Sequence, residues 1–338
     1  MVGHPARFYH SLTNKAVQCY LCPRQCVLKP GDRGYCFARR NDHGQLVLTT
    51  YGLSSGFAVD PIEKKPLHHF LPGTQILSFG TIGCNLGCRF CQNWRISKPK
   101  NAQALGVEAS PLEIARKALE LGVPSVAFTY NEPIVSTEFV IDTAKECQTL
   151  GIKTVAVTAG YISDQARLEF FEHIDAANVD LKAFSHDFYA RLCNGSLAPV
   201  LDTLLYIKHK TDVWLEITNL VIPDENNDMK IFKEMARWIK AELGKDVPLH
   251  VSAFHPDHQM MNTPRTGVDI LQEARQIALD EGLLYVYTGN VSDEEGGSTC
   301  CPACKKCVIK RAGFKIMEYH IKKSKCEYCQ ATIAGVFS

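Results

Sequence analysis

The chain has 338 residues, of which 46% are hydrophobic, so it can form one large core with small additions or two domains. Its 37 basic and 36 acidic residues give a formal net charge of +1, unlike the strong basic excess of nucleic-acid-binding proteins. No apolar run approaches the roughly 20 residues that span a bilayer, and the polar N-terminus lacks the apolar core of a signal peptide. We therefore expect a cytoplasmic protein that binds neither membranes nor nucleic acids.

The chain contains 15 cysteines, an odd and unusually large number. Because the cytosol is reducing, clustered thiols there bind metal or take part in chemistry more often than they form disulfides. Thirteen of them fall into three clusters. Cys147 and Cys193 stand alone, and we expect them to behave as small apolar residues.

Residues 1–68 are predicted to form a small N-terminal module with a hairpin near Gly44. Four cysteines in this segment have C-x2-C-x3-C-x9-C spacing, namely Cys19, Cys22, Cys26 and Cys36. Four thiolates accept either zinc or an auxiliary [4Fe–4S] cluster, so the number of ligands leaves both metals open.

Residues 69–291 alternate short β-branched runs with amphipathic stretches of helical periodicity. The predicted strands are Ile76–Ile82, Ser125–Tyr130, Lys153–Thr158, Asn178–Leu181, Val213–Leu220, Leu249–Phe254 and Leu284–Tyr287. The predicted helices are Pro111–Leu121, Thr137–Leu150, Ile231–Leu243 and Asp269–Glu281. This alternation predicts an α/β fold of parallel strands, either a full or partial barrel or an open sheet, with the functional site at the carboxyl ends of the strands.

The first strand of this repeat leads directly into G-C-N-L-G-C-R-F-C-Q-N-W, in which Cys84, Cys88 and Cys91 have C-x3-C-x2-C spacing. Thiolates suit iron–sulfur clusters and zinc, and a cubane cluster usually takes four of them. Three thiolates in one loop would leave one iron open for a ligand. The alternatives are a structural zinc and a cluster completed by a distant cysteine.

Residues 292–338 are predicted to form a C-terminal zinc-ribbon-like module, joined to the core by a polar linker, Ser292–Ser298. Two C-x2-C pairs 21 residues apart favour zinc ligation, by Cys301, Cys304, Cys326 and Cys329. The register is open because Cys304 and Cys307 also form a C-x2-C pair, and because Cys300 precedes Cys301. An auxiliary iron–sulfur cluster is the alternative to zinc.

The cysteine triplet, with an aromatic residue before its last cysteine, resembles the signature of radical S-adenosylmethionine (SAM) enzymes. Four longer stretches resemble one subgroup, the AmmeMemoRadiSam-system radical SAM enzymes, which are relatives of pyruvate formate-lyase activating enzyme. They are D-P-I-E-K-K-P-L-H-H-F (60–70), G-C-N-L-G-C-R-F-C-Q-N-W (83–94), T-Y-N-E-P (129–133) and V-D-L-K (179–182). The resemblance implies a partial (βα)6 TIM-like barrel that carries both cysteine-rich extensions.

The resemblance also implies the chemistry. The triplet would bind a [4Fe–4S] cluster whose open iron chelates SAM, and reductive cleavage of SAM would give a 5′-deoxyadenosyl radical that abstracts hydrogen from an unidentified substrate. A low-potential donor, flavodoxin or ferredoxin, would supply the electron. Memo-like and AMMECR-like proteins would be pathway partners.

Six further residues are implied SAM contacts: Phe90, Asn131, Glu132, Asp180, Lys182 and His250. Many family members carry Gly-Gly-Glu where this chain has Asn131-Glu132, so the backbone approach must differ. The simpler alternatives are a solvated turn at Glu132, an internal ion pair between Asp180 and Lys182, and a core histidine at His250. His68 and His69 could also face the substrate.

Two other functions remain open from the sequence. An activase that places a glycyl radical on a partner enzyme would have nearly the same SAM site, but would admit a peptide loop. A non-catalytic metal- or RNA-binding protein would use the cysteine modules and the basic C-terminal tail.

Overall fold

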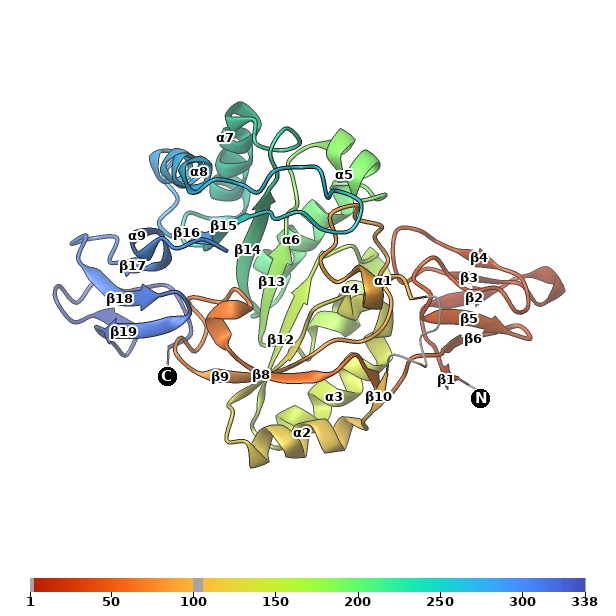
Figure 1. Cartoon of the computed structure of the whole chain (residues 1–338). Helices are drawn as coiled ribbons and strands as arrows, with labels where there is room; N and C mark the ends of the chain where they lie inside the picture. The colour runs from red at the N-terminus through yellow and green to blue at the C-terminus, as the bar shows by residue number, and fades with distance from the viewer. Residues whose placement is uncertain (1–2, 100–105, 338) are drawn as a thin grey trace.

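The computed structural model describes residues 3–99 and 106–337, and its centre is an eight-stranded sheet (Figure 1). The strand order is β16-β15-β14-β13-β12-β11-β9-β8, in which β9 to β16 run parallel and β8 is antiparallel to β9. The strands span Phe57–Pro61 (β8), Gln75–Phe79 (β9), Ser125–Phe128 (β11), Lys153–Thr158 (β12), Ala176–Asp180 (β13), Trp214–Val221 (β14), Leu249–Ala253 (β15) and Val286–Gly289 (β16). In the described residues, β8 and β16 are the two unpaired edges, so the barrel is partial.

Helices connect the parallel strands and cover the outside of the sheet (Figure 1). They span Trp94–Ser97 (α1), Pro111–Glu120 (α2), Thr137–Thr149 (α3), Asp164–Phe171 (α4), His186–Leu192 (α5), Ala198–Lys210 (α6), Met229–Trp238 (α7) and Val268–Asp280 (α8). Ser110 caps α2 by accepting from the Glu113 amide, with Pro111 at the first helical position. Six strand–helix units followed by β16 confirm the expected α/β partial barrel.

The N-terminal module consists of two small antiparallel sheets. The strands are His4–Pro5 (β1), Tyr9–Ser11 (β2), Val17–Cys19 (β3), Val27–Leu28 (β4), Arg39–Asp42 (β5) and Gln45–Leu48 (β6), and a short pair joins Leu53–Ser54 (β7) to Val107–Glu108 (β10). The β5–β6 pair is the hairpin expected at Gly44. A buried ion pair fixes this module to α3, because the Arg39 guanidinium lies 2.5 Å from the Glu138 carboxylate and both side chains are almost fully buried.

The C-terminal module lies on the opposite side of the barrel from the N-terminal one (Figure 1). Its elements are Glu294–Gly297 (α9), Thr299–Cys300 (β17), Cys307–Ala312 (β18), Lys315–Tyr319 (β19), Ile321–Lys322 (β20) and Lys325–Cys326 (β21). The prediction that Ser292–Ser298 is an irregular linker is wrong, because this segment contains the short helix α9 and its N-cap Asp293. Asp293 accepts from the Gly296 amide at 3.0 Å, and Ser298 Oγ accepts from the Arg311 amide at 3.1 Å.

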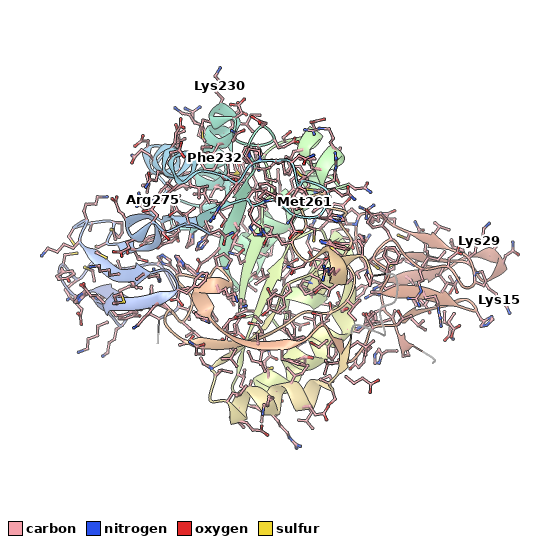
Figure 2. All side chains as sticks on the ribbon, viewed as in Figure 1. Lys15, Lys29, Lys230, Phe232, Met261 and Arg275 are labelled. Atoms are coloured by element: carbon pink, nitrogen blue, oxygen red, sulfur yellow. The ribbon has the colours of Figure 1, made fainter. Side chains whose placement is uncertain are left out.

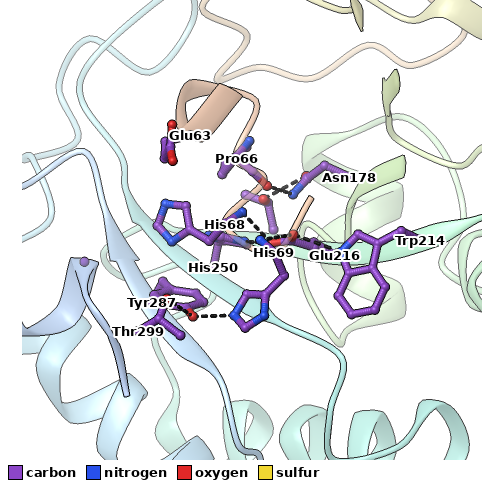
Figure 3. Close-up of polar contacts among 12 residues, drawn as sticks. Glu63, Pro66, His68, His69, Asn178, Trp214, Glu216, His250, Tyr287 and Thr299 are labelled. Atoms are coloured by element: carbon purple, nitrogen blue, oxygen red, sulfur yellow. Dashed lines mark hydrogen bonds and ion pairs between the residues drawn. The ribbon is translucent and has the colours of Figure 1, made fainter. Parts of the chain in front are cut away.

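Residues 62–70 cross the barrel between β8 and β9, and inward-facing side chains of four strands hold this floor segment (Figure 3). Asn178 on β13 donates to the Pro66 carbonyl at 2.7 Å. Glu216 on β14 accepts from the amides of His68 and His69 at 3.0 and 2.8 Å. Glu216 also accepts from His250 of β15 at 2.6 Å, and Tyr287 of β16 bonds the His69 ring at 2.5 Å.

The floor segment is also the docking surface for the C-terminal module. The His69 ring bonds the Ala334 carbonyl at 2.6 Å, and Phe70 forms a parallel bridge with Val336. Arg311 is fully buried, donates to the His68 carbonyl at 3.0 Å and lies 3.6 Å from the Glu63 carboxylate. Two segments more than 240 residues apart therefore share one buried polar interface.

Figure 2 shows Lys15 and Lys29 at the outer end of the N-terminal module and Lys230 at the far end of α7. All three are exposed, and Lys230 lies on a different part of the molecule from Lys15 and Lys29. The basic residues labelled in this view are thus dispersed, as expected for solvated charges. No helix in the described part of the chain combines the length and apolar character that crossing a membrane requires.

Acid should weaken the interface between the floor segment and the C-terminal module, because that interface contains the buried His69. Burial lowers the pKa of His69 to about 4, whereas an unfolded histidine binds a proton near pH 6.5. Because the unfolded chain then binds more protons, stability is lost as the pH falls from 6.5 towards 4, by about 2 kcal/mol at pH 5. Thermal unfolding at pH 7.5 and pH 5 should show a smaller loss for His69→Gln than for the unaltered chain. Equal losses would contradict a neutral, buried His69.

Candidate active site

A cavity of about 1110 Å³ lies at the carboxyl ends of the parallel strands. Side chains at or after the ends of all seven parallel strands line it, as parallel-strand architectures lead one to expect. All six residues named as SAM contacts and all three thiols of the triplet are among them: Cys84, Cys88, Cys91, Phe90, Asn131, Glu132, Asp180, Lys182 and His250. The fold therefore brings the predicted site residues together.

The cysteine triplet lies on the loop between β9 and α1. The three thiols face this cavity, and no fourth thiol of the described residues lines it. Cys84 Sγ accepts from the Leu86 amide at 3.4 Å, and Cys91 Sγ lies 3.6 Å from Ser97 Oγ. The buried thiol of Cys193 lies beside Cys88 but does not line the cavity. Three thiolates on the cavity wall fit a [4Fe–4S] cluster with one open iron.

Asn131 braces this loop from the end of β11. Its carboxamide NH2 donates to the Gly83 carbonyl at 2.7 Å, and its oxygen accepts from the Thr81 amide at 2.9 Å. Lys98 adds a bond of 2.7 Å to the Cys84 carbonyl. Asn131 lines the cavity, but its side-chain bonds go to the loop that carries the thiols.

Glu132 is buried where β11 ends, and the solvated-turn alternative is therefore wrong. Its carboxylate accepts from Thr158 Oγ1 at 2.6 Å, from the Ala159 amide at 2.8 Å and from the Ile134 amide at 3.2 Å. Burial raises the pKa of Glu132 to about 7, although these donors favour the carboxylate. A buried carboxylate in this setting gains from a nearby cation.

Asp180 and Lys182 form the internal ion pair that the sequence left as an alternative. Lys182 Nζ lies 2.8 Å from the Asp180 carboxylate, and both side chains line the cavity. Burial alone would lower the pKa of Lys182, but the Asp180 carboxylate raises it well above its usual value. Lys182 thus remains charged beside the cavity.

The histidines divide between the cavity and the floor. His250 lines the cavity, and Glu216 fixes the His250 ring by a hydrogen bond. His68 also lines the cavity, and its ring lies edge-on to the His250 ring with the centres 4.7 Å apart. His69 faces the C-terminal module, so the suggestion that it faces the substrate is wrong. Phe90 packs against Phe188 with the ring centres 5.8 Å apart and lines the cavity.

Sequence reasoning missed a second charged cluster at the cavity wall. Asp60 lies 2.6 Å from Lys65 Nζ and 2.9 Å from Lys64 Nζ, and it accepts from the Tyr130 hydroxyl at 2.8 Å. Lys64, Lys65 and Tyr130 line the cavity. The signal was present, because two lysines and an aspartate stand within six residues in the D-P-I-E-K-K stretch.

The two remaining cysteine clusters differ in spacing. The sulfur atoms of Cys301, Cys304, Cys326 and Cys329 all lie within 4.8 Å of one another, including pairs at 3.6 and 3.8 Å. Tetrahedral zinc with Zn–S bonds of roughly 2.3 Å requires sulfurs about 3.8 Å apart. The N-terminal thiols, those of Cys19, Cys22, Cys26 and Cys36, surround a separate small cavity.

Comparison with known proteins agrees with this geometry. The family model of the radical SAM superfamily matches residues 79–239. An uncharacterized protein of Methanocaldococcus jannaschii is 40% identical over 326 residues, which cover 96% of this chain and 97% of that protein. A putative glycyl-radical enzyme activating enzyme of the same organism is 26% identical over 222 residues, covering 63% of this chain and 78% of the relative.

Among solved structures, a radical SAM methyltransferase from Sphaerobacter thermophilus shares the fold. It has a TM-score of 0.51 and 15% sequence identity, with 65% of this chain and 67% of that chain covered. The family model, which matches the strands and helices around the cavity, indicates the class of radical SAM proteins. The chain belongs to the radical SAM superfamily.

Removing the Asn131 brace should lower cluster occupancy. In Asn131→Asp the side chain still accepts from the Thr81 amide but no longer donates to the Gly83 carbonyl, and each lost bond costs about 1 kcal/mol. Iron per chain after anaerobic reconstitution should fall in Asn131→Asp and further in Asn131→Ala. Asn178→Ala breaks a bond of the same length to the Pro66 carbonyl in the floor segment and should keep its iron. Full iron content in Asn131→Ala would refute the bracing role.

Proposed function

We propose that this radical SAM enzyme cleaves SAM reductively and acts on a small molecule inside the barrel. The observation that carries the proposal is the set of three thiols facing one cavity, with no fourth among the described residues that line it. Cys84, Cys88 and Cys91 would hold a [4Fe–4S] cluster, with flavodoxin or ferredoxin as the electron donor. With SAM bound, that cluster supplies a 5′-deoxyadenosyl radical for hydrogen abstraction.

The residues around the triplet suit the chemical groups of SAM. Glu132 would bind the ammonium group, because a buried carboxylate with a raised pKa gains from a cation. Lys182, held by Asp180, would contact the carboxylate or ribose, and Phe90 would lie against the adenine. Asn131 and His250 would act as positioning residues, since each is fixed by bonds within the protein.

Both the size and the walls of the cavity support a small substrate. Its volume of about 1110 Å³ exceeds the roughly 300–1,000 Å³ of a site for one drug-sized ligand. The cavity can therefore hold SAM and a small substrate together. The hairpin turn of the C-terminal module, Ala312–Phe314, forms part of the wall. That module docks against the floor segment and β16, so it narrows the route that a partner's peptide loop would need.

Two buried polar atoms of residues that line this cavity have no hydrogen-bond partner among the described residues. They are Glu63 Oε2 and His68 Nδ1. Burial lowers the pKa of His68 well below its usual value, so its ring is neutral and can donate or accept. Both atoms are covered by neighbouring side chains, so a substrate would bond them only after those side chains shift. Unpaired buried groups are costly, and that cost favours a polar substrate over an apolar one.

A second candidate is glycyl-radical activation of a partner enzyme. The relative described as a putative activating enzyme favours it, and the SAM site would serve either reaction. The C-terminal hairpin in the cavity wall weighs against it. We also propose that the chain is a member of the AmmeMemoRadiSam subgroup, with Memo-like and AMMECR-like pathway partners, because the four motif stretches resemble that subgroup.

The C-terminal cysteines, Cys301, Cys304, Cys326 and Cys329, would hold one structural zinc. A module of this size has little core of its own, and zinc–thiolate bonds would offset that deficit. This module contributes Ala312–Phe314 to the cavity wall. The zinc would therefore affect the active site by stabilising that wall and would take no part in the chemistry.

SAM cleavage is directly testable. Anaerobically reconstituted protein with dithionite and SAM should release 5′-deoxyadenosine, and Cys88→Ala should abolish the release. Cys147→Ala is the matched control, because that thiol is buried in α3 and lies outside the three clusters. If reduced protein with a full cluster gives no 5′-deoxyadenosine, the proposed reaction is wrong.

Zinc content separates the register alternatives. Purified protein should contain one zinc per chain, which Cys326→Ala should remove together with part of the thermal stability. Cys307→Ala should retain the zinc, because that thiol is not among the four whose sulfurs lie within 4.8 Å of one another. Zinc loss in Cys307→Ala with retention in Cys326→Ala would reverse the assignment.

A further inference from the structure

The four N-terminal thiols lie around one enclosed space. Cys19, Cys22, Cys26 and Cys36 all line a cavity of about 20 Å³ between the N-terminal module and the triplet loop. Arg24, Arg39 and Asn85 also contribute to its wall. The charge of Arg39 is compensated by Glu138, so of these two cations it is the Arg24 guanidinium that suits a site carrying negative charge when a metal is bound.

The spacing of these thiols differs from that of the C-terminal set. In the described residues, the C-terminal cysteines alone bring three or more ligand atoms within 4.8 Å of one another, the separation that suits a single ion. The N-terminal thiols do not meet this spacing, and neither do those of the catalytic triplet. A cubane cluster spreads its thiolates over four irons, whereas zinc gathers four sulfurs around one ion.

We propose that Cys19, Cys22, Cys26 and Cys36 ligate a second [4Fe–4S] cluster, with one thiolate for each iron. The catalytic triplet, for which a [4Fe–4S] cluster is proposed above, resembles the N-terminal set in one respect, because its thiols are likewise not gathered within 4.8 Å of one another. Four thiolates leave no open iron. The second cluster therefore cannot chelate SAM, and electron transfer is the chemistry left to it.

A single stretch of backbone separates the two cluster sites. Cys84 and Leu86 line the large cavity, whereas Asn85 between them lines the small one. Arg24 donates to the Asn85 carbonyl from the N-terminal side. The triplet loop is therefore a shared wall, with one cysteine cluster on each of its faces.

Tyr35 and Cys36 pack directly onto this wall. Gly83 has a φ of +106°, and any Cβ there would collide with the Cys36 carbonyl, so only glycine permits this approach. Lys98 Nζ donates to both the Tyr35 and the Cys84 carbonyls, at 3.1 and 2.7 Å. The ring of Tyr35 lies between Lys98 and Arg24, whose charged groups are 3.7 and 3.5 Å from its centre. This packing fixes the position of the N-terminal thiols relative to the triplet.

The test removes the ligands of the catalytic cluster and measures the iron and sulfide that the chain still binds. The triple variant Cys84→Ala/Cys88→Ala/Cys91→Ala, reconstituted anaerobically, should keep about four irons and four sulfides per chain. The electron paramagnetic resonance spectrum of its reduced cluster should not change when SAM is added. Cys22→Ser/Cys26→Ser should also keep about four irons, but there SAM should alter the spectrum.

Metal analysis gives the opposing outcomes. If the triple variant holds no iron and binds a second zinc instead, the N-terminal site is a zinc site and the proposal fails. Absence of any metal beyond the C-terminal zinc refutes it as well. Cys147→Ala should keep about eight irons and controls for the loss of a buried thiol.

The result does not depend on SAM cleavage. Iron retained in the triple variant would support the second cluster even if the intact protein released no 5′-deoxyadenosine. If neither multiple variant folds, Mössbauer spectroscopy and iron analysis of the unaltered protein decide. About eight irons support the second cluster, and about four overturn it.

Discussion

The carboxylate of Glu216 is the constraint on which the interior of the barrel depends. It is fully buried on β14 and accepts from the His68 and His69 amides, from the His250 ring and from the Trp214 indole. Burial would raise the pKa of Glu216, but the His250 hydrogen bond and charge lower it. Loss of this carboxylate would leave several buried donors without a partner, which costs far more than one exposed hydrogen bond.

The position of this carboxylate links the floor segment to the active site and to the C-terminal module. The two backbone amides that it binds fix residues 68 and 69, whose side chains point in different directions. His68 turns to the cavity and His69 to Tyr287 and Ala334. His250 at the cavity and the surface on which the C-terminal module docks therefore share one anchor, so a change in either reaches the other through Glu216.

Periodicity predicted the framework of this molecule well because the sheet is buried on both faces and its helices are amphipathic. Lys153–Thr158 is predicted with the bounds of β12, and α3 with an error of one residue. Helices α4, α5 and α6 were not predicted. Arg167 of α4 is buried and donates to Thr203 of α6, so a charged residue takes a core-facing position and interrupts the apolar stripe of α4. The cysteine spacing located three sites but not their metals, because sulfur separations depend on the fold.

Spacing along the sequence also did not predict that the stretches 60–70 and 129–133 contact each other through Asp60 and Tyr130. Tyr130 has a φ of +70°, a conformation that glycine adopts freely and tyrosine rarely does. Its hydroxyl donates to Asp60 at 2.8 Å, and its carbonyl accepts from Asn93 at 2.7 Å, so contacts at both ends hold this backbone. Asp60 is in turn fixed by Lys65.

The stretch 60–70 thus supports the turn at 129–133, which carries Asn131 and Glu132 into the cavity. Many radical SAM enzymes have glycines at the corresponding strand end, and this chain has none there. The strained turn persists because a buried ion pair from another part of the chain anchors the Tyr130 side chain. The Asn131 carboxamide, in a place where glycine would have no side chain, can then brace the cysteine loop. The departure from the glycine motif and the charged D-P-I-E-K-K stretch are therefore two parts of one solution to positioning Glu132.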